Sequence, residues 1–339
     1  TMASTRLDIG NELLSTTMHI VMKEWRDNIY TSTAFLEAQT RVHGEGQPTQ
    51  AGGTRIVTPL GFGEHSKTTK METGYERIDL SVSDVFQPAV YDFGHVVRPV
   101  AISSEEEMTN QGDAAILSIL ENRVTSVANA LKREYVKHMV QGGVSEWDKW
   151  NTLNGIDVAN GFLENAAAGS GSQAADVGGV SKATFSSKTG WNNQFFDIAD
   201  SFNSNGLAGL YDLMVEINAV SAQGNPNVIL ASRGGFKNLK RALQASERYM
   251  DEKSLDGGRM STTFQGVPID VEYYMPNAGG TSATTEASFY FLNMNDIYTL
   301  WDPKGYFDLS DFETVSGEYD VRAAKLRCRG QLIAKHLGS

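Results

Sequence analysis

The sequence has 339 residues, of which 40% are hydrophobic and 21% charged, so it can bury a sizeable core and favours a globular protein of two or more lobes. Its formal net charge of −12 argues against a general nucleic-acid-binding protein, because phosphate contacts draw on clustered Lys and Arg. No apolar stretch is long enough for a membrane-spanning helix, and the N-terminal residues lack the pattern of a secretory signal. We therefore expect a protein that is made and used in a cytoplasm.

The N-terminal region carries an apolar stripe at helical spacing. The stripe consists of Leu14, Met18, Val21, Trp25 and Ile29, with Asn11 ahead of it as a cap. A helix with Trp25 on its apolar face needs a surface to pack on. That surface is either its own core or a neighbouring subunit, and the sequence pattern leaves both open.

The segment from Arg41 to Gly74 is polar and rich in glycine, with only brief apolar runs such as Arg55 to Leu60. Such a composition buries too little apolar surface to fold alone. Tyr75 to Val90 alternates apolar and polar side chains, which predicts a half-exposed return strand. Together the two legs predict a long two-stranded excursion with a Lys-containing tip at Glu64 to Glu72. Because an isolated two-stranded ribbon is marginally stable in water, we expect this one to lie on a partner.

A short strand at Val96 to Ile102 is followed by the acidic start of a short helix. Ser103 with Glu106, or Ser104 with Glu107, has the spacing of a capping box. Three consecutive Glu also raise a metal-binding hypothesis, but residues one and two apart on a helix do not face each other. The cap is the better interpretation.

The strongest helical pattern in the chain runs from Asp113 to Val140. Its apolar stripe consists of Ile116, Leu120, Val124, Val127, Leu131, Tyr135 and Met139. Gly142 and Gly143 end the run after a basic last turn. At 1.5 Å per residue this helix is about 40 Å long, which makes it a structural strut rather than a site.

The second half of the chain alternates helices and strands after an irregular, glycine-containing connection from Gly142 to Gly190. Aromatic residues in and after this connection, Trp147, Trp150 and those of Trp191 to Phe202, are expected in a core or an interface. Two helices are predicted here. One carries Leu210 to Val220, and the other carries Phe236 to Leu243 and is capped by Ser232. The predicted strands are Val228 to Ala231, Gly266 to Glu272, Ser288 to Leu292 and Ile297 to Trp301. This order indicates an α+β lobe.

The last predicted strand, Ala324 to Arg329, has a basic face of Lys325, Arg327 and Arg329. This face suits acidic partner surfaces or packaged nucleic acid, although a solvated strand face is the simpler interpretation. On the other face lies Cys328, the single cysteine of the chain, which we interpret as a small buried hydrophobic residue.

The search for catalytic motifs is negative. The sequence contains no Gly-x-Ser-x-Gly, no Walker loop, no His-Glu-x-x-His and no closely spaced pair of His suited to metal binding. The six His are scattered over different predicted elements. We expect no cofactor and no enzyme, although a catalytic group assembled only in the fold remains an alternative.

The order of elements resembles that of the major capsid proteins of tailed bacteriophages, which have the HK97 fold, over nearly the whole chain. Three segments are similar to that family individually. They are the strand and capped helix that begin at Pro226-Asn227-Val228, the strand Phe264 to Val271 with its Gly-Val-Pro, and the late strand pair Ser288 to Trp301.

The resemblance implies an α+β, HK97-like fold divided into familiar parts. These would be an N-terminal arm (1–40), an extended β-hairpin loop (41–90), a peripheral domain (91–205) with a spine helix at 113–140, an axial domain (206–309) and a return to the peripheral domain (310–339). The chain lacks a long, charged helical leader ahead of the arm, so a separate scaffolding protein is expected, unless a leader has been cleaved.

The function implied is self-assembly, as hexamers and pentamers, into an icosahedral shell around a double-stranded DNA genome, without sequence-specific DNA binding and without a membrane. A portal and a decoration protein would be further partners. An encapsulin-like nanocompartment shell is the main alternative. The residues expected at contacts between subunits are Trp25, Glu64, Lys67, Lys70, Glu72, Lys325, Arg327 and Arg329.

Overall fold

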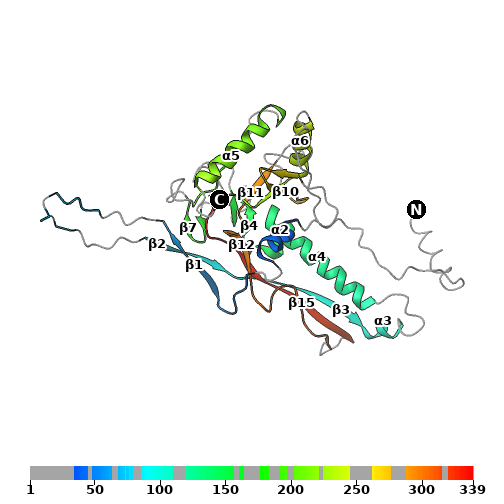
Figure 1. Cartoon of the computed structure of the whole chain (residues 1–339). Helices are drawn as coiled ribbons and strands as arrows, with labels where there is room; N and C mark the ends of the chain where they lie inside the picture. The colour runs from blue at the N-terminus through cyan, green and yellow to red at the C-terminus, as the bar shows by residue number, and fades with distance from the viewer. Residues whose placement is uncertain are drawn as a thin grey trace.

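The structure is a computed structural model of the chain. It describes residues 34–44, 48–62, 68–72, 74–75, 77–78, 85–109, 119–155, 160–163, 176–182, 191–196, 202–220, 224–244, 262–275, 288–314 and 320–338. These residues form a mixed α+β fold, with an elongated lower part, a smaller upper lobe and a two-stranded ribbon that runs out to one side (Figure 1).

A single long strand, β15, organises the lower part. It pairs antiparallel with β3 along ten consecutive residue pairs, and its C-terminal half pairs with β12. Its alternation buries Leu326 and Cys328 and exposes Lys325 and Arg327, as the sequence predicts. The strands of this sheet are β3 (Gly94–Ser103), β12 (Ile297–Trp301), β13 (Asp308–Leu309), β14 (Glu313–Thr314) and β15 (Val321–Ala334).

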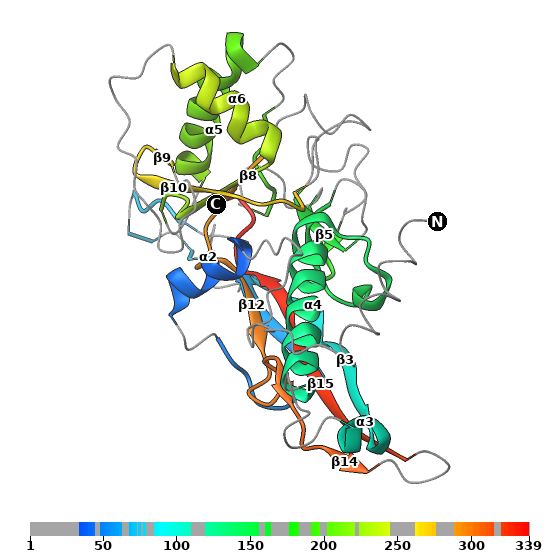
Figure 2. The same cartoon turned by 90° about the vertical axis from the view of Figure 1, so that its right-hand side faces the viewer.

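Helix α4 (Ile119–Gln141) runs along this sheet (Figure 2). Its predicted stripe is confirmed in the C-terminal half, where Leu131, Tyr135 and Met139 are fully buried. The predicted first residues, 113–118, lie outside the described part of the chain. The helix ends as predicted, because Gly142 has φ +76° and its N–H donates to the carbonyl oxygen of His138 over 2.9 Å.

An aromatic cluster joins α4 to the sheet. The ring of Tyr135 lies 5.6 Å from Trp147, 5.9 Å from Trp150 and 5.2 Å from Trp301, measured between centroids. A Cβ on Gly94 would lie 2.1 Å from Nε1 of Trp150, so only glycine lets β3 approach the indole. The expectation that Trp147 and Trp150 anchor a core is therefore confirmed.

The connection predicted to be irregular contains two small strand pairs in its described part. One is parallel, the other is a tight hairpin, and Trp191 donates from its indole nitrogen to the carbonyl of Val180 over 3.2 Å. These strands are β4 (Thr152–Asn154), β5 (Gly161–Leu163), β6 (Asp176–Val177) and β7 (Val180–Ser181), and a 3₁₀ turn (Ser145–Trp147) precedes them.

The upper lobe is a four-stranded sheet in the order β11-β8-β10-β9, with two helices packed on one face. Its two helices and three of its strands match the predicted elements, whereas the edge strand β9 was not predicted as a separate strand. Ser232 caps the second helix by accepting a hydrogen bond from the N–H of Gly235 over 3.1 Å. The helices are α5 (Leu207–Val220), which follows a π-helical turn (Phe202–Gly206), and α6 (Arg233–Gln244). The strands are β8 (Val228–Ala231), β9 (Thr262–Phe264), β10 (Val267–Val271) and β11 (Phe289–Leu292).

Helix α2 (Ala34–His43) ties the two parts together. The Glu272 carboxylate, from the upper lobe, accepts a hydrogen bond from the N–H of Phe35 at the start of α2, over 3.3 Å. Gln39 in turn donates to Oγ1 of Thr299 in β12 of the lower sheet, over 3.0 Å. The stripe predicted at Leu14 to Ile29 lies outside the described residues.

Strands β1 (Arg55–Gly61) and β2 (Phe86–Asp92) form the base of the predicted ribbon. The prediction that the return strand starts at Tyr75 is wrong. Tyr75 and Ile78 are not in a strand and are 95% and 54% exposed, because no strand in the described part of the ribbon pairs with them and no core lies against them.

A capping box joins α3 (Ser104–Thr109) to the end of β3, and an arginine of α4 braces it. The N–H of Glu106 donates to Oγ of Ser103 and the N–H of Ser103 donates to Glu106, both over 3.2 Å, as predicted. Both Glu106 oxygens also accept hydrogen bonds from the Arg123 guanidinium, over 2.8 and 2.7 Å. This fork fixes α3 against α4.

The fork predicts an acid-sensitive contribution to stability. The hydrogen bonds from Arg123, and then those from Ser103, lower the pKa of Glu106 from 4.5 to about 2. Because the folded-state pKa is below the unfolded-state value, the contribution is complete above about pH 4.5 and is lost as the pH falls toward 2. The Tm of Glu106→Gln should therefore be lower than that of the wild type at pH 7, and the two should converge near pH 2.

The matched control for this measurement is Glu105→Gln, on the exposed side of the same helix. A difference in Tm between Glu106→Gln and the wild type that is equal at both pH values would contradict the role of the carboxylate.

Candidate assembly surfaces

The ribbon base, formed by β1 and β2, has one buried face and one exposed face. Ile56 and Leu60 of β1 and Tyr91 of β2 point inward and join the main core, with exposures of 3 to 5%. Tyr91 also donates from its hydroxyl to the carbonyl oxygen of Ala334 over 3.1 Å. The root of the ribbon is therefore part of the folded body rather than an independent excursion.

The opposite face of the same two strands is apolar and exposed. Val57 and Val90 lie directly across from each other, and Val57 and Phe86 are 58% and 77% exposed. Apolar side chains thus occupy both faces of the two-stranded ribbon, and one of these two faces is exposed to water. We call the set Val57, Pro59, Phe86, Pro88 and Val90 the outer ribbon face. The sequence analysis did not single it out, although the run Ile56-Val57 with Pro59-Leu60 shows that both faces of β1 are apolar.

The predicted contact residues of the ribbon tip are only partly described. Lys70 and Glu72 form an ion pair with each other, and both side chains are largely exposed, so the pair contributes little to stability. Glu64 and Lys67 lie outside the described residues, as does Trp25. The structure therefore brings two of the predicted residues together.

The predicted basic face of β15 divides into two parts. Lys325 and Arg327 are exposed, and Arg327 lies opposite Asp308 in the strand register. Arg329, by contrast, pairs with Asp302, stacks over the ring of Phe93 at 4.7 Å and donates to the carbonyl oxygen of Gly53 over 3.1 Å. Arg329 therefore makes contacts within its own subunit, while Lys325 and Arg327 remain exposed at the surface.

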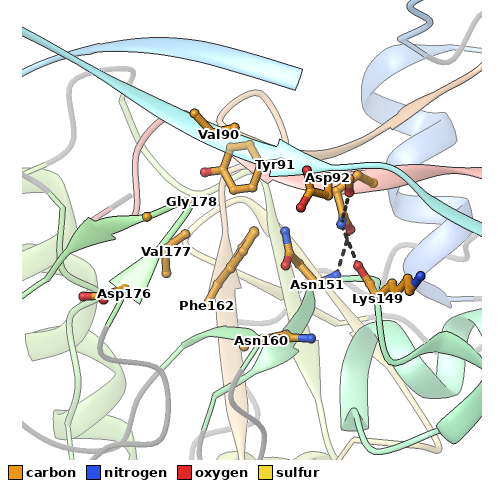
Figure 3. A pocket seen from close by; sticks show the side chains of 13 residues that line it. Val90, Tyr91, Asp92, Lys149, Asn151, Asn160, Phe162, Asp176, Val177 and Gly178 are labelled. Atoms are coloured by element: carbon orange, nitrogen blue, oxygen red, sulfur yellow. Dashed lines mark hydrogen bonds between the residues drawn. The ribbon is translucent and has the colours of Figure 1, made fainter. Parts of the chain in front are cut away.

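A cleft of about 260 Å³ opens where the ribbon root meets the two small strand pairs (Figure 3). Figure 3 shows Tyr91, Phe162 and Val177 on its apolar side and Asp92, Asn151 and Lys149 on its polar side. The Gln331 side chain spans this polar side by donating to the carbonyl oxygens of Asp92 and Lys149, over 2.6 and 2.9 Å.

Two amide side chains of the cleft are hydrogen-bonded to backbone groups of their own chain. Oε1 of Gln331 accepts a hydrogen bond from the N–H of Asn151 over 2.8 Å, and the Asn151 side chain donates to the carbonyl oxygen of Leu332 over 2.9 Å. Within the described ranges, no three His, Cys, Asp or Glu gather in a way that suits a metal ion. In the same part of the chain, no helix is both long and apolar enough to cross a membrane.

Burial shifts the pKa of two titratable side chains in the core. Burial raises the pKa of the Cys328 thiol well above its usual value, so the nucleophilic thiolate is disfavoured. Burial lowers the pKa of His138, whose Nε2 lies 2.9 Å from the carbonyl oxygen of Trp150. The structure thus supports the interpretation of Cys328 as a small core residue.

Comparison with solved structures identifies the fold. The chain matches the capsid of cyanophage A-1(L) with 14% identity and a TM-score of 0.66, over 97% of each chain. It matches the holo-SrpI encapsulin complex of Synechococcus elongatus PCC 7942 with 12% identity and a TM-score of 0.54, over 97% of this chain and 92% of that one. A structure of Mycobacterium phage Bobi matches with 12% identity and a TM-score of 0.55, over 97% and 93%.

The chain therefore has the HK97-like fold of phage capsid and encapsulin structures. No protein-family model matches the chain, and no curated protein matches it by sequence. At 12 to 14% identity these likenesses concern the fold alone.

The division of the basic face predicts two different outcomes for its arginines. Arg329→Ala removes a charged hydrogen bond and a stacked cation, so it should lower the free energy of unfolding by roughly 1–3 kcal/mol. Arg327→Ala, at an exposed position of the same strand, should change it by less than about 0.5 kcal/mol. Urea unfolding of the dissociated subunits measures both values, and equal effects of the two substitutions would contradict the division.

Proposed function

We propose that this protein is the major capsid protein of a tailed bacteriophage, and that it assembles as hexamers and pentamers into an icosahedral shell around double-stranded DNA. The observation that carries the proposal is the end-to-end match to the cyanophage A-1(L) capsid, which spans 97% of both chains. A match of that extent covers the projecting ribbon as well as the two lobes, rather than a shared core alone.

The surface of the subunit supports an assembling protein. The outer ribbon face places Val57 and Phe86 against water, with exposures of 58% and 77%. Burying such side chains contributes about 25 cal/mol per Å² of apolar surface removed from water. A second subunit laid on the outer ribbon face would supply that burial.

The charge of the chain supports a container rather than a DNA-binding protein. DNA that is packed into a shell must slide past the wall, and each phosphate neutralised by the wall would add salt-dependent affinity. A net charge of −12 keeps such contacts few. Lys325 and Arg327 then serve contacts with acidic residues of neighbouring subunits, and we propose no sequence-specific DNA binding.

We propose the following roles for the parts of the chain. Residues 1–40 form the arm, 41–90 the extended loop, and 91–205 the peripheral domain with α4 as its spine. Residues 206–309 form the axial domain around the hexamer and pentamer centres, and 310–339 return to the peripheral domain. Contacts between subunits would include Trp25, the tip residues Glu64, Lys67, Lys70 and Glu72, and the surface charges of β15.

The proposed partners follow from the same role. A scaffolding protein, a portal and a decoration protein would act with this chain, the shell would assemble in the host cytoplasm, and the mature protein would reside in the virion.

The encapsulin match supports a second candidate function, a shell that encloses a protein cargo. The two candidates differ in what the shell holds. Nucleic acid inside particles purified from the native source supports the phage capsid, whereas an enclosed protein in its place supports the nanocompartment.

The direct test of the proposal is negative-stain electron microscopy of the purified wild-type protein. We expect closed, icosahedral particles and ring-shaped capsomers in the unassembled fraction. Sedimentation of the wild-type protein as a monomer under all assembly conditions tried, including high concentration, neutralising salt and co-expression with the proposed scaffolding protein, would overturn the proposal.

A ribbon variant tests the role of the extended loop. The N–H of Phe62 donates to the carbonyl oxygen of Val85 over 3.0 Å, so residues 63–84 can be replaced by an Asn-Gly turn that closes the hairpin there. Because Ile56 and Leu60 stay in the core, the variant should keep the Tm of the wild-type subunit. We expect it to form no closed shells, and normal shells by microscopy would show that the loop is dispensable.

A further inference from the structure

The two helices of the upper lobe carry charges of opposite sign. Helix α5 (Leu207–Val220) contains two acidic residues and no Lys or Arg, and helix α6 (Arg233–Gln244) contains four basic residues and no Asp or Glu. The acidic residues Asp212 and Glu216 are four apart and exposed, so they share one face of α5. Arg233, Lys237 and Arg241 are also four apart and exposed, so they form one stripe along α6.

The two faces differ in what surrounds the charges. Beside the carboxylates of α5 lie two exposed apolar side chains, Tyr211 at 48% and Val215 at 63%. We call these four residues the acidic patch. Like charges four apart on a helix repel each other, so the basic stripe of α6 costs its own subunit stability. An acidic surface laid against the stripe would offset that repulsion.

Figure 1 shows the two helices at the top of the molecule, α5 on the left and α6 on the right. Tyr211 of α5 contacts Phe264 of β9, with ring centroids 4.9 Å apart, and β9 is one edge strand. Gly235 of α6 packs against Phe289 of β11, since a Cβ there would lie 3.1 Å from the ring, and β11 is the other edge strand. Both helices pack on one face of the sheet, at the top of the molecule in Figure 2.

From this placement we propose that the acidic patch of α5 docks on the basic stripe of α6 in a second copy of this chain. Two different surfaces of one chain make a head-to-tail contact between copies, which closes into a ring when the rotation between copies permits. The basic stripe is about 12 Å long and the two carboxylates are about 6 Å apart, so the patch fits within the stripe. The methylene stems of Lys237 and Arg241 would cover Tyr211 and Val215.

This inference rests on the proposed shell function and names the surfaces that join copies around a ring. Electrostatic pairing at such a contact steers association and fixes register, and like charges in its place cost several kcal/mol. Nucleic acid is the other occupant that a basic helix face suits, and the experiment treats it as an outcome.

Charge reversal tests the pairing with three variants. Variant A is Asp212→Lys with Glu216→Lys, variant B is Lys237→Glu with Arg241→Glu, and variant C combines all four substitutions, so its net charge equals that of the wild type. We expect A and B alone to lower the yield of particles more than about tenfold, because each places like charges at every contact. Variant C restores opposite charges and should assemble like the wild type.

A mixture of A and B separates a contact between subunits from one within a subunit. In the mixture the basic α5 of variant A meets the acidic α6 of variant B, and the acidic α5 of variant B meets the basic α6 of variant A. Copies of A and B can therefore alternate around a ring. We expect rings of six and extended lattices to return. Closed shells should stay fewer than with C, since a ring of five cannot alternate without one like-charged contact.

The outcomes decide the proposal. Normal assembly of variant A or of variant B overturns the proposal, and so does failure of variant C to assemble. If A assembles normally and B alone fails, the result also points to nucleic acid as the occupant of α6. Recovery in C without recovery in the mixture overturns it in favour of a contact within one subunit. All three variants should keep the Tm of the wild-type subunit, because the substituted side chains are exposed. Failure of the wild type itself to assemble, with or without the proposed scaffolding protein, would instead refute the proposed function.

Discussion

The ten-pair ladder between β15 and β3 is the constraint on which the remainder of the described structure depends. It joins residues as far apart in the sequence as Gly94 and Gly330, so its formation requires the closure of a very long loop, at a substantial entropic cost. The aromatic cluster of Tyr135, Trp147, Trp150 and Trp301 offsets that cost, because it buries four large rings between α4 and the sheet. With the sheet formed, Gln331 fixes the ribbon root and Arg329 fixes the segment before it.

The amide side chains beside the ribbon root are hydrogen-bonded within the subunit, whereas apolar side chains of the ribbon base face outward. The cleft beside the ribbon root illustrates the first property, since the amides of Gln331 and Asn151 bond to backbone groups of their own chain. The outer ribbon face illustrates the second. The same fold occurs in phage capsid and encapsulin structures.

Much of the fold follows from local pattern, and the functional surfaces do not. Strand β8, strand β12, the Ser103 capping box and the Ser232 cap were predictable because their signals are short-range: alternation, hydroxyl caps and turn residues. The start of the return strand was mispredicted because alternation at Tyr75 and Ile78 carries no information about whether a partner strand is present. Arg329 looked like one of three equivalent charges, since its partners Asp302, Phe93 and Gly53 are distant in sequence. The outer ribbon face and the charged faces of α5 and α6 gain meaning only from strand order and burial.

Helix α2 has a mechanical consequence. Its first turn is hydrogen-bonded to Glu272, and Arg41 in its last turn pairs with Asp270. The Gln39 side chain donates to Thr299, and Nε2 of His43 lies 2.8 Å from the carbonyl oxygen of Met294. A helix attached in this way to both sheets passes tension along the chain into two hydrophobic cores at once, instead of peeling one strand at a time. Pulling on the preceding residues would therefore load several hydrogen bonds in parallel. In the shell that we propose, internal pressure would therefore be resisted through the interior of each subunit as well as through the contacts between subunits.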